Sequence, residues 1–292
     1  MPSSRWKGNA LACLSISLFT AFALMSRAGL TTGLTAKDIA ALRFGVGGVL
    51  LLPIVVKHGL GGLRVLQAVE LAALGGIGFA MLAYAGFALA PAAHGTVLIH
   101  GTLPLTTALL AFAFGDTRKA TAGAPGLVLT AVAVLAMLLD RSTERSDPGH
   151  AGDICLLLAS FCWSAYGIRV RRLGIPAIHA AAIVATVSAA LYMPVYALMP
   201  GKALFDAAWP TLLVQAVVQG ALIGAASIFV YTRAIAHLGA TRMSHFVATV
   251  PAIATIGGWL FLGEQPGALG VAGPCLAVAG TVVGLRGSSV RD

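Results

Sequence analysis

Charged residues are scarce in this sequence. Asp, Glu, Lys and Arg together make up 10% of the 292 residues, whereas 58% of the residues are hydrophobic. A soluble domain of this length cannot cover so much apolar surface with so few charged side chains. The composition therefore excludes a soluble enzyme or binding domain and predicts an integral membrane protein.

Cysteine is scarce too, and catalytic motifs are missing. The four cysteines all fall in apolar segments, where a thiol behaves as a small hydrophobe, so we expect no disulfide, no metal site and no cofactor. The sequence contains neither a His-Glu-x-x-His zinc motif nor a Gly-x-Ser-x-Gly nucleophile elbow. All ten acidic residues lie at the ends of apolar segments, in connections or at the terminus. We therefore predict that the protein is not an enzyme.

Ten apolar segments follow one another with short connections. A helix needs about 20 apolar residues to cross the hydrocarbon core of a bilayer. Continuous apolar runs in lipid favour helices, because a helix satisfies its own backbone hydrogen bonds. We predict an all-α integral membrane protein with ten transmembrane helices, at Gly8–Arg27, Ala36–Val56, Leu66–Leu89, Ala93–Phe114, Thr121–Leu139, Ala151–Ile168, Ala177–Met199, Trp209–Ile235, Ala240–Leu262 and Gly267–Leu285.

The ten segments read as two copies of one five-helix unit. Gly8-Asn9 and Gly152-Asp153 open two segments that start 144 residues apart, and other like residues recur at offsets of 144 or 147. An odd number of spans in each copy inserts the second copy upside down, which is typical of alternating-access transporters. We predict inverted repeats at 1–139 and 151–292, joined by an outer loop at 140–150. The recurring pairs are Arg27 with Arg171, Tyr84 with Tyr231, Pro104 with Pro251, and Gly123 with Gly270.

The positive charges are distributed unevenly between the two sides of this predicted bundle. With the N-terminus in the cytoplasm, 13 of the 19 Lys and Arg residues fall on the cytoplasmic side, 5 fall outside, and Arg43 lies within a span. Cytoplasmic connections of membrane proteins are enriched in Lys and Arg. The bias predicts cytoplasmic termini and a multi-pass protein of the cell inner membrane, and it explains the net charge of +9 without a nucleic-acid partner.

The first apolar segment has a second interpretation. Arg5 and Lys7 precede an apolar run that reaches Ala21-Phe22-Ala23, which has the form of a signal peptide with a cleavage site. The run is long for that role, and it matches the sixth segment in its position within the repeat. We therefore expect it to be retained as a transmembrane helix.

Several motifs occur in an order typical of a known transporter family. They are Gly152-Asp153 followed by Phe161-Cys162-Trp163-Ser164, Arg43 in the second segment, and Pro251 followed by Leu262-Gly263-Glu264-Gln265-Pro266, with a weaker copy of the last pattern at Pro104 and Gly115-Asp116. This pattern resembles the drug/metabolite transporter superfamily, in particular its EamA-type ten-helix exporters, and most of all the YddG-type amino-acid exporters. The resemblance implies metabolite export. The second half departs from the pattern, since no arginine in the seventh segment corresponds to Arg43.

Polar and aromatic residues inside the predicted spans are the candidate substrate contacts. An ionisable group at membrane depth is costly and is a functional candidate by default. His100 shares a helical face with Thr96 and Thr107, and an internal hydrogen bond is the alternative to substrate contact. Arg43 either binds a substrate carboxylate, bonds backbone carbonyls or extends to the interface. The full set of predicted pathway residues is Trp163, His100, Tyr84, Phe79, Thr20, Ser164, Thr96, Ser244, His245 and Arg43.

Two prolines and two acidic residues complete the candidates. Pro104 and Pro251 are predicted to kink the fourth and ninth helices near their middles and to act as hinges. Asp116 and Glu264 each precede a predicted helix, where we expect them to cap its N-terminus. Tyr84 and Tyr231 are interpreted either as pathway residues or as interfacial anchors, and His94 is placed near the outer surface.

These features together predict an exporter of small amphipathic metabolites, with aromatic and other neutral amino acids first. The absence of a carboxylate near any helix centre argues against ion coupling. The alternatives are a proton-coupled drug/metabolite exporter using histidine, and an exchanger of sugar phosphates or nucleotide sugars. A receptor, scaffold or lipid-handling protein is a further class. We expect a small-molecule substrate, the lipid bilayer as surroundings, and a functional monomer.

Overall fold

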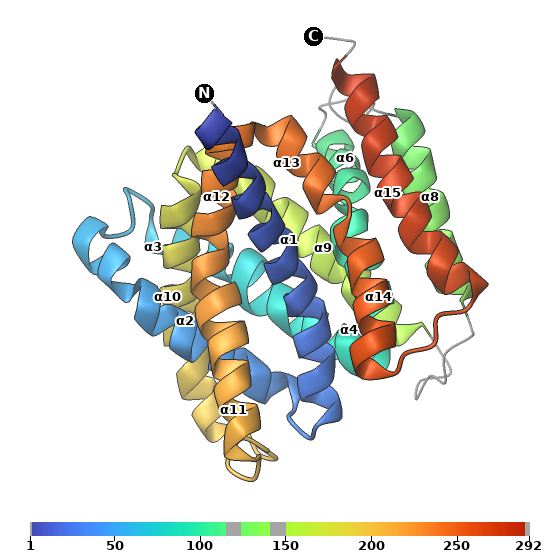
Figure 1. The fold of residues 1–292 in the computed structure, drawn as a ribbon. Coiled ribbons are helices and arrows are strands. Elements are labelled where there is room, and N and C mark those ends of the chain that lie inside the picture. The colour runs from blue at the N-terminus through green and yellow to red at the C-terminus, as the bar shows by residue number, and fades with distance from the viewer. Residues whose placement is uncertain (1, 115–123, 141–149, 290–292) are drawn as a thin grey trace.

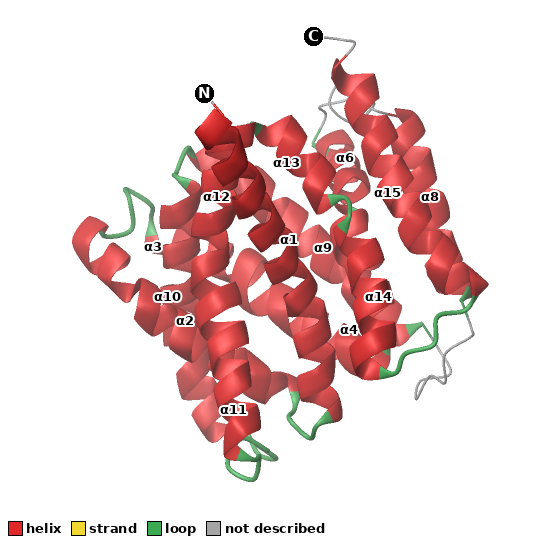
Figure 2. Ribbon diagram, in the orientation of Figure 1, coloured by secondary structure: helices red, strands yellow, loops and turns green. Residues whose placement is uncertain are grey.

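The fold is a bundle of helices (Figures 1 and 2). The computed structural model describes residues 2–114, 124–140 and 150–289, and in these ranges every regular element is a helix. The all-α prediction is therefore confirmed for this part of the chain. The chain termini lie at one end of the bundle, at the top of Figure 1, and we call the opposite end the lower end.

The elements follow the predicted segments closely. The first part of the chain contains α1 (Pro2–Thr31), α2 (Ala36–His58), α3 (Val65–Ala72), η1 (Ala73–Gly78), α4 (Phe79–Leu89), α5 (Ala92–Thr96), η2 (Val97–Gly101), α6 (Leu103–Ala113) and α8 (Ala124–Leu139). The second part contains α9 (Ala151–Leu173), α10 (Ala177–Leu198), α11 (Trp209–Gln215), η3 (Ala216–Ala226), α12 (Ser227–Leu238), α13 (Ala240–Val247), α14 (Val250–Leu262) and α15 (Ala268–Ser289). The η elements are π-helical.

In the described ranges, eight helical segments are long and apolar enough to cross a membrane. They include the composite segments Val65–Leu89, Ala92–Ala113, Trp209–Leu238 and Arg242–Leu262. Large apolar side chains such as Leu198 and Phe261 are exposed on the bundle surface, as expected where lipid replaces water. The protein is thus a multi-pass membrane protein. The apolar parts of the two remaining helices, Ala124–Leu139 and Ala268–Gly284, are shorter, so the count of ten spans stays a prediction.

The helices pair in a pattern that the predicted repeat requires. Helix α2 packs on α10, and α8 lies beside α15 (Figure 1). Helix α1 of the first half packs on α12 and α14 of the second half. Helix α9 of the second half packs on α4 and α6 of the first half, which are the corresponding helices in the predicted repeat. The inverted repeat itself stays a prediction.

Glycines bring these pairs close enough to pack without a hydrophobic driving force. A Cβ atom on Gly126 would lie 2.5 Å from the backbone of Gly284, and one on Gly220 would lie 2.9 Å from the carbonyl of Leu42. Backbone atoms cannot move aside as a flexible side chain can. Only glycine therefore permits the approach of α8 to α15 and of η3 to α2.

Two of the spans are broken near their middles. The α-helical pattern is interrupted around Thr102 in one span and around Ala248 and Thr249 in the other. Pro104 and Pro251 each occupy the second residue of the helix that follows, where the missing N–H leaves no intrahelical bond unmade. Both spans are thus disrupted beside their prolines, as expected, although the disruption is an interruption of the helix and not a kink within a continuous one. The two prolines restart a helix after an interruption, and their action as hinges stays a prediction.

Candidate functional site

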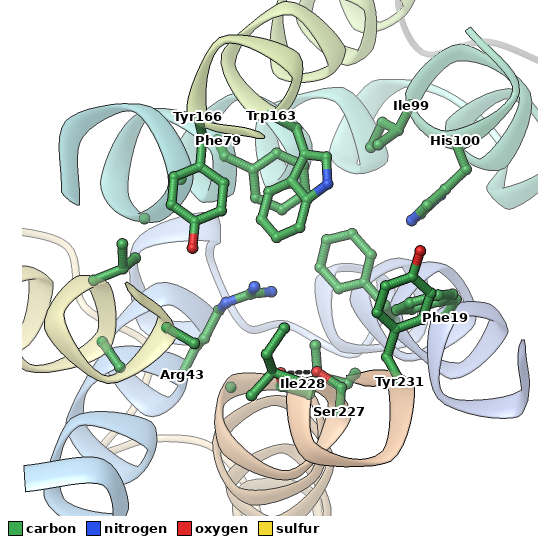
Figure 3. A pocket seen from close by; sticks show the side chains of 18 of the residues that line it. Phe19, Arg43, Phe79, Ile99, His100, Trp163, Tyr166, Ser227, Ile228 and Tyr231 are labelled. Carbon is green, nitrogen blue, oxygen red and sulfur yellow. Dashed lines mark hydrogen bonds between the residues drawn. The ribbon is translucent and has the colours of Figure 1, made fainter. Parts of the chain in front are cut away.

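A cavity of about 230 Å³ lies at the centre of the bundle, and Figure 3 shows its walls. Its lining comes from α1, α2, η1, α4, η2, α6, α9, α10, η3, α12 and α13, so both halves of the chain contribute. The lining surface is mostly apolar, and glycines at 75, 76 and 224 keep part of the wall free of side chains. A concave apolar space with a few polar groups is the usual form of a small-molecule site.

Aromatic rings form one wall of the cavity. The ring centroid of Trp163 lies 4.9 Å from that of Phe79 and 5.3 Å from that of Tyr166, and Phe22 stacks on Phe79 at 5.8 Å. Trp163 and Tyr166 are three residues apart on α9, so they project from the same side of that helix. These contacts fix the rings as a surface on which a planar apolar group can stack.

Arg43 extends from α2 into the cavity opposite this wall (Figure 3). Its guanidinium carbon lies 5.2 Å from the ring centroid of Phe22 and 5.8 Å from that of Phe79, which are cation–π distances. Its Nη1 atom is buried and has no hydrogen-bond partner among the described residues. A buried N–H group without an acceptor is costly, so this atom is ready to bond an incoming ligand.

A second aromatic group closes the other side of the cavity. The ring of Phe19 lies 5.8 Å from His100 and 5.7 Å from Tyr231. His100 and Tyr231 also line a neighbouring cavity of about 170 Å³, together with Ser244, Pro104 and Pro251. This aromatic group therefore separates the central cavity from a second space beside the two helix interruptions.

A hydroxyl network lies behind the tryptophan wall. Ser164 Oγ is 2.7 Å from Thr106 Oγ1 and accepts a hydrogen bond of 3.2 Å from Thr107. Thr102 donates to Ser160, which in turn donates to the Ile99 carbonyl. These hydroxyl groups tie α9 to α6 and to η2. Ser164 is thus a buried link between helices and does not line the cavity.

The sequence-based candidates fall into two groups. Trp163, Phe79, His100 and Arg43 line the central cavity, and Ser244 lines the neighbouring one. Outside both linings lie Tyr84, Thr20, Ser164, Thr96 and His245.

Some of the residues outside the linings have structural contacts instead. Tyr84 is fully buried and donates a hydrogen bond to Gln219, and Thr96 bonds the Ala93 carbonyl of its own helix. The π-helical η2 between Thr96 and Thr107 breaks the period of 3.6 residues. The expectation that these two threonines and His100 share one face was therefore wrong. Thr20 Oγ1 is buried without a partner in the described part of the chain.

Most of the cavity residues were not among the predicted pathway residues, and three of these are aromatic residues that bear on the site. Phe19 and Tyr166 line the cavity, and so does Tyr231 in place of its repeat partner Tyr84. For Tyr166 a signal was available, because it follows Trp163 by three residues on one helix. Tyr231 was named beside Tyr84 as its partner in the predicted repeat, but only Tyr84 was placed in the pathway set, and Gln219 holds Tyr84 in the core.

At the lower end, Arg27 and Glu264 tie four helices together. Arg27 donates hydrogen bonds of 2.9 Å to the carbonyls of Phe87 and Ala88 at the end of α4, and its Nε lies 3.5 Å from Glu264 Oε1. Glu264 also accepts from the Ala92 backbone N–H at the start of α5. Capping by Glu264 occurs, but on a helix distant in sequence rather than on the helix that follows it. Asp116 lies outside the described residues.

Burial of this contact affects the pKa of Glu264. Burial raises the pKa of Glu264, whereas the Ala92 N–H and the Arg27 guanidinium oppose that rise. His94 lies next to this pair at the lower end, and its side chain is buried at 1% exposure. Its expected place near the outer side of the membrane stays a prediction. Its Nδ1 lies 2.9 Å from Asp153 Oδ1, and Nε2 lies 3.4 Å from Asp140 Oδ2. The lower end is therefore closed by polar contacts between both halves of the chain.

Comparison with known proteins gives a family match for the second half of the chain. Residues 150–286 match the EamA-like transporter family. The second half of the chain therefore matches an EamA-like transporter domain. This match supports the resemblance to the drug/metabolite transporter superfamily, and proteins of the EamA-like family are membrane transporters of small molecules.

A solved structure shares the fold of the whole chain. One of 7 matching chains, described only as the crystal structure of a protein, has a TM-score of 0.61. The similarity covers 98% of this chain and 99% of that one, at 20% sequence identity. Identity at this level shows the fold alone. A search of curated proteins found no match.

Proposed function

We propose that the transporter exports small amphipathic metabolites through the central cavity by alternating access, with aromatic and other neutral amino acids as the first class to test. In this proposal, ten spans form two inverted five-helix repeats in the cell inner membrane, with both termini in the cytoplasm. Helices α1 and α9 each pack on the corresponding helices of the other half, and this supports the repeat. The proposal needs one chain only, because both halves line one cavity.

One observation carries the proposal. The central cavity combines an aromatic wall of Trp163, Phe79 and Tyr166 with the unpartnered Nη1 of Arg43. The rings provide a stacking surface for an apolar side chain, and a guanidinium is a strong partner for a carboxylate. An amphipathic molecule of amino-acid size satisfies both features at once.

Ion coupling is not needed by this site. Among the described residues that line the cavity, none is acidic, whereas coupled carriers commonly bind their ion through a buried carboxylate. One observation favours the proton-coupled alternative. His100 lines the cavity, and its Nδ1 has no hydrogen-bond partner in the described chain.

Phosphate esters are disfavoured as substrates, because Arg43 is the one lining residue in the described ranges with a permanent positive charge.

Transport by purified protein in proteoliposomes tests the proposal. We would measure uptake of a panel of amino acids, aromatic carboxylates and one sugar phosphate, each with and without a proton gradient. Uptake of large neutral amino acids that ignores the gradient supports the uncoupled mechanism, and uptake that follows the gradient supports coupling through His100. Uptake of the sugar phosphate alone would overturn the proposal.

The interruptions at Thr102 and Thr249 lead to a prediction about rate. Pro251→Ala restores a backbone N–H that can bond the Val247 carbonyl and join α13 to α14 in one continuous helix. We expect turnover in proteoliposomes to fall roughly 3- to 10-fold while the half-saturation concentration changes little, because a rate change of this size needs only about 1 kcal/mol.

Pro194→Ala is the matched control for this prediction. Pro194 lies inside α10, which continues through it, and it does not line the central cavity. The control should transport at the rate of the unmodified protein. An unchanged rate in Pro251→Ala, with unchanged populations of the two end states, would remove the support for a hinge at this site.

A further inference from the structure

The charges around the central cavity are unbalanced in one direction. Arg43 brings a permanent positive charge, and no Asp or Glu is among the described lining residues. His100 brings either a neutral ring or a second positive charge. In every protonation state of its histidine, the described lining therefore presents a net positive charge to whatever enters.

The nearest acidic residue on the same helix does not correct this imbalance. Asp38 lies five residues before Arg43 on α2 and is fully buried. Its oxygens accept hydrogen bonds from Tyr196, from the Ala203 N–H and from Thr35. These contacts hold the Asp38 carboxylate away from the cavity, so it is not available to a ligand.

The aromatic wall already faces a cation. Phe22 and Phe79 receive the Arg43 guanidinium at 5.2 and 5.8 Å from their ring centroids. A second cation placed beside the same rings would lie close to Arg43 and be repelled by it, with little water to screen the repulsion. A carboxylate, in contrast, would accept a hydrogen bond from the unpartnered Nη1 and pair with the guanidinium.

A zwitterionic amino acid meets both effects at once. Its carboxylate is attracted to Arg43, whereas its ammonium group must leave water without an anionic partner and remain within a few ångströms of the same guanidinium. Removing the ammonium group keeps the attraction and eliminates the cost, since a buried charge without a partner is strongly unfavourable.

From this charge balance we infer that the cavity selects aromatic monocarboxylates, such as aryl-substituted propionic or keto acids, over the zwitterionic amino acids with the same ring. This inference rests on the proposed function, because it concerns the substrate of the same cavity. Arg43 is the specificity-determining residue, and Trp163 with Phe79 receives the ring. The ligand carboxylate supplies the hydrogen bond that Arg43 Nη1 lacks among the described residues.

Three ligands with one ring and different charges test the inference. They are 3-phenylpropionate, phenylalanine and 2-phenylethylamine, which are anionic, zwitterionic and cationic at neutral pH. Binding to the purified full-length protein at pH 7 would be measured by titration calorimetry, which avoids the leak of the protonated acid through bilayers. We expect 3-phenylpropionate to bind about tenfold more tightly than phenylalanine, and 2-phenylethylamine to bind most weakly.

Variants at Arg43 connect the preference to that residue. Arg43→Gln should weaken 3-phenylpropionate binding at least tenfold and leave 2-phenylethylamine unchanged or improved. Arg43→Lys keeps the charge and should keep the order of the three ligands, with a smaller gap, because an ammonium group lacks the two-pronged geometry of guanidinium. If Arg43→Gln fails to fold, the ligand order on the unmodified protein and on Arg43→Lys still decides the question.

The outcomes separate this inference from the proposed function. Phenylalanine binding as tightly as 3-phenylpropionate, or Arg43→Gln binding the acid normally, would overturn the inference while amino-acid transport stands. Failure of all three ligands to bind, together with no uptake of any amino acid or aromatic acid by proteoliposomes, would remove the proposed function itself.

Discussion

Replacing Trp163 with alanine is expected to weaken substrate binding roughly 30-fold, which corresponds to about 2 kcal/mol of lost apolar and aromatic contact. The side chain lines the cavity, and its ring lies 4.9 Å from Phe79. Removing it takes away the central part of the stacking surface. The measurement is the half-saturation concentration of the best substrate in proteoliposomes, with the amount of folded protein checked by gel filtration.

Two further variants separate a lost contact from a lost fold. Trp163→Phe keeps a ring in the wall and should lose only a few-fold in affinity. Trp259→Ala removes the same side chain from an exposed position on α14, at 59% exposure, and should transport normally. Normal transport by Trp163→Ala would remove this residue from the pathway.

The membrane fold is predictable from this sequence because composition and segment length decide it. A chain with 58% hydrophobic residues and short connections has few alternatives to a helical bundle in lipid. The number of spans is harder to predict than the helical fold, because the apolar parts of α8 and α15 are shorter than those of the other spans. These two helices pack on each other by close backbone approach at Gly126 and Gly284, which does not require a long apolar run.

The cavity is predictable only in part. Trp163 and Arg43 stand out in sequence because a large indole or a charge at membrane depth needs a partner. Whether a given side chain faces the cavity is harder to predict. The π-helical η2 shifts the direction of every later side chain in its span, and no residue type marks such a turn reliably. Tyr84 and Tyr231 occupy like positions in the repeat, yet only Tyr231 reaches the cavity.

Long-range polar contacts are the least predictable part of the site. Glu264 bonds the Ala92 N–H, a residue 172 positions earlier, although the sequence alone favours the helix that follows it. Helix capping requires only a carboxylate near free N–H groups, and tertiary packing decides which helix supplies them. The role could be predicted from the sequence, but its partner could not.

Replacing Arg27 with glutamine is expected to open the lower end of the bundle. The change removes the hydrogen bonds to the Phe87 and Ala88 carbonyls and leaves Glu264 without its cation. The Arg27 and Glu264 side chains are only 23% and 14% exposed, so the lost contacts should cost about 2–3 kcal/mol. We expect the melting temperature to fall by roughly 5 °C or more.

Thiol labelling measures the opening directly. Ala93 lines the small space between Glu264, His94 and Asp140, so a cysteine placed there reports access to the lower end in a background without the four natural cysteines. Labelling by a membrane-impermeant reagent should increase several-fold in Arg27→Gln, since the C-terminal end of α4 and the loop after α14 are then no longer joined through this side chain.

Arg169→Gln is the matched control for Arg27→Gln. Arg169 also pairs with a carboxylate, through bonds of 2.7 and 2.9 Å to the two oxygens of Glu70. The side chains of Arg169 and Glu70 are each about a third exposed, and ion pairs in water contribute little to stability. This control should leave Ala93→Cys labelling and the melting temperature unchanged. If Arg27→Gln behaves in the same way, closure of the lower end depends on the apolar packing of its helices and not on the contacts of Arg27.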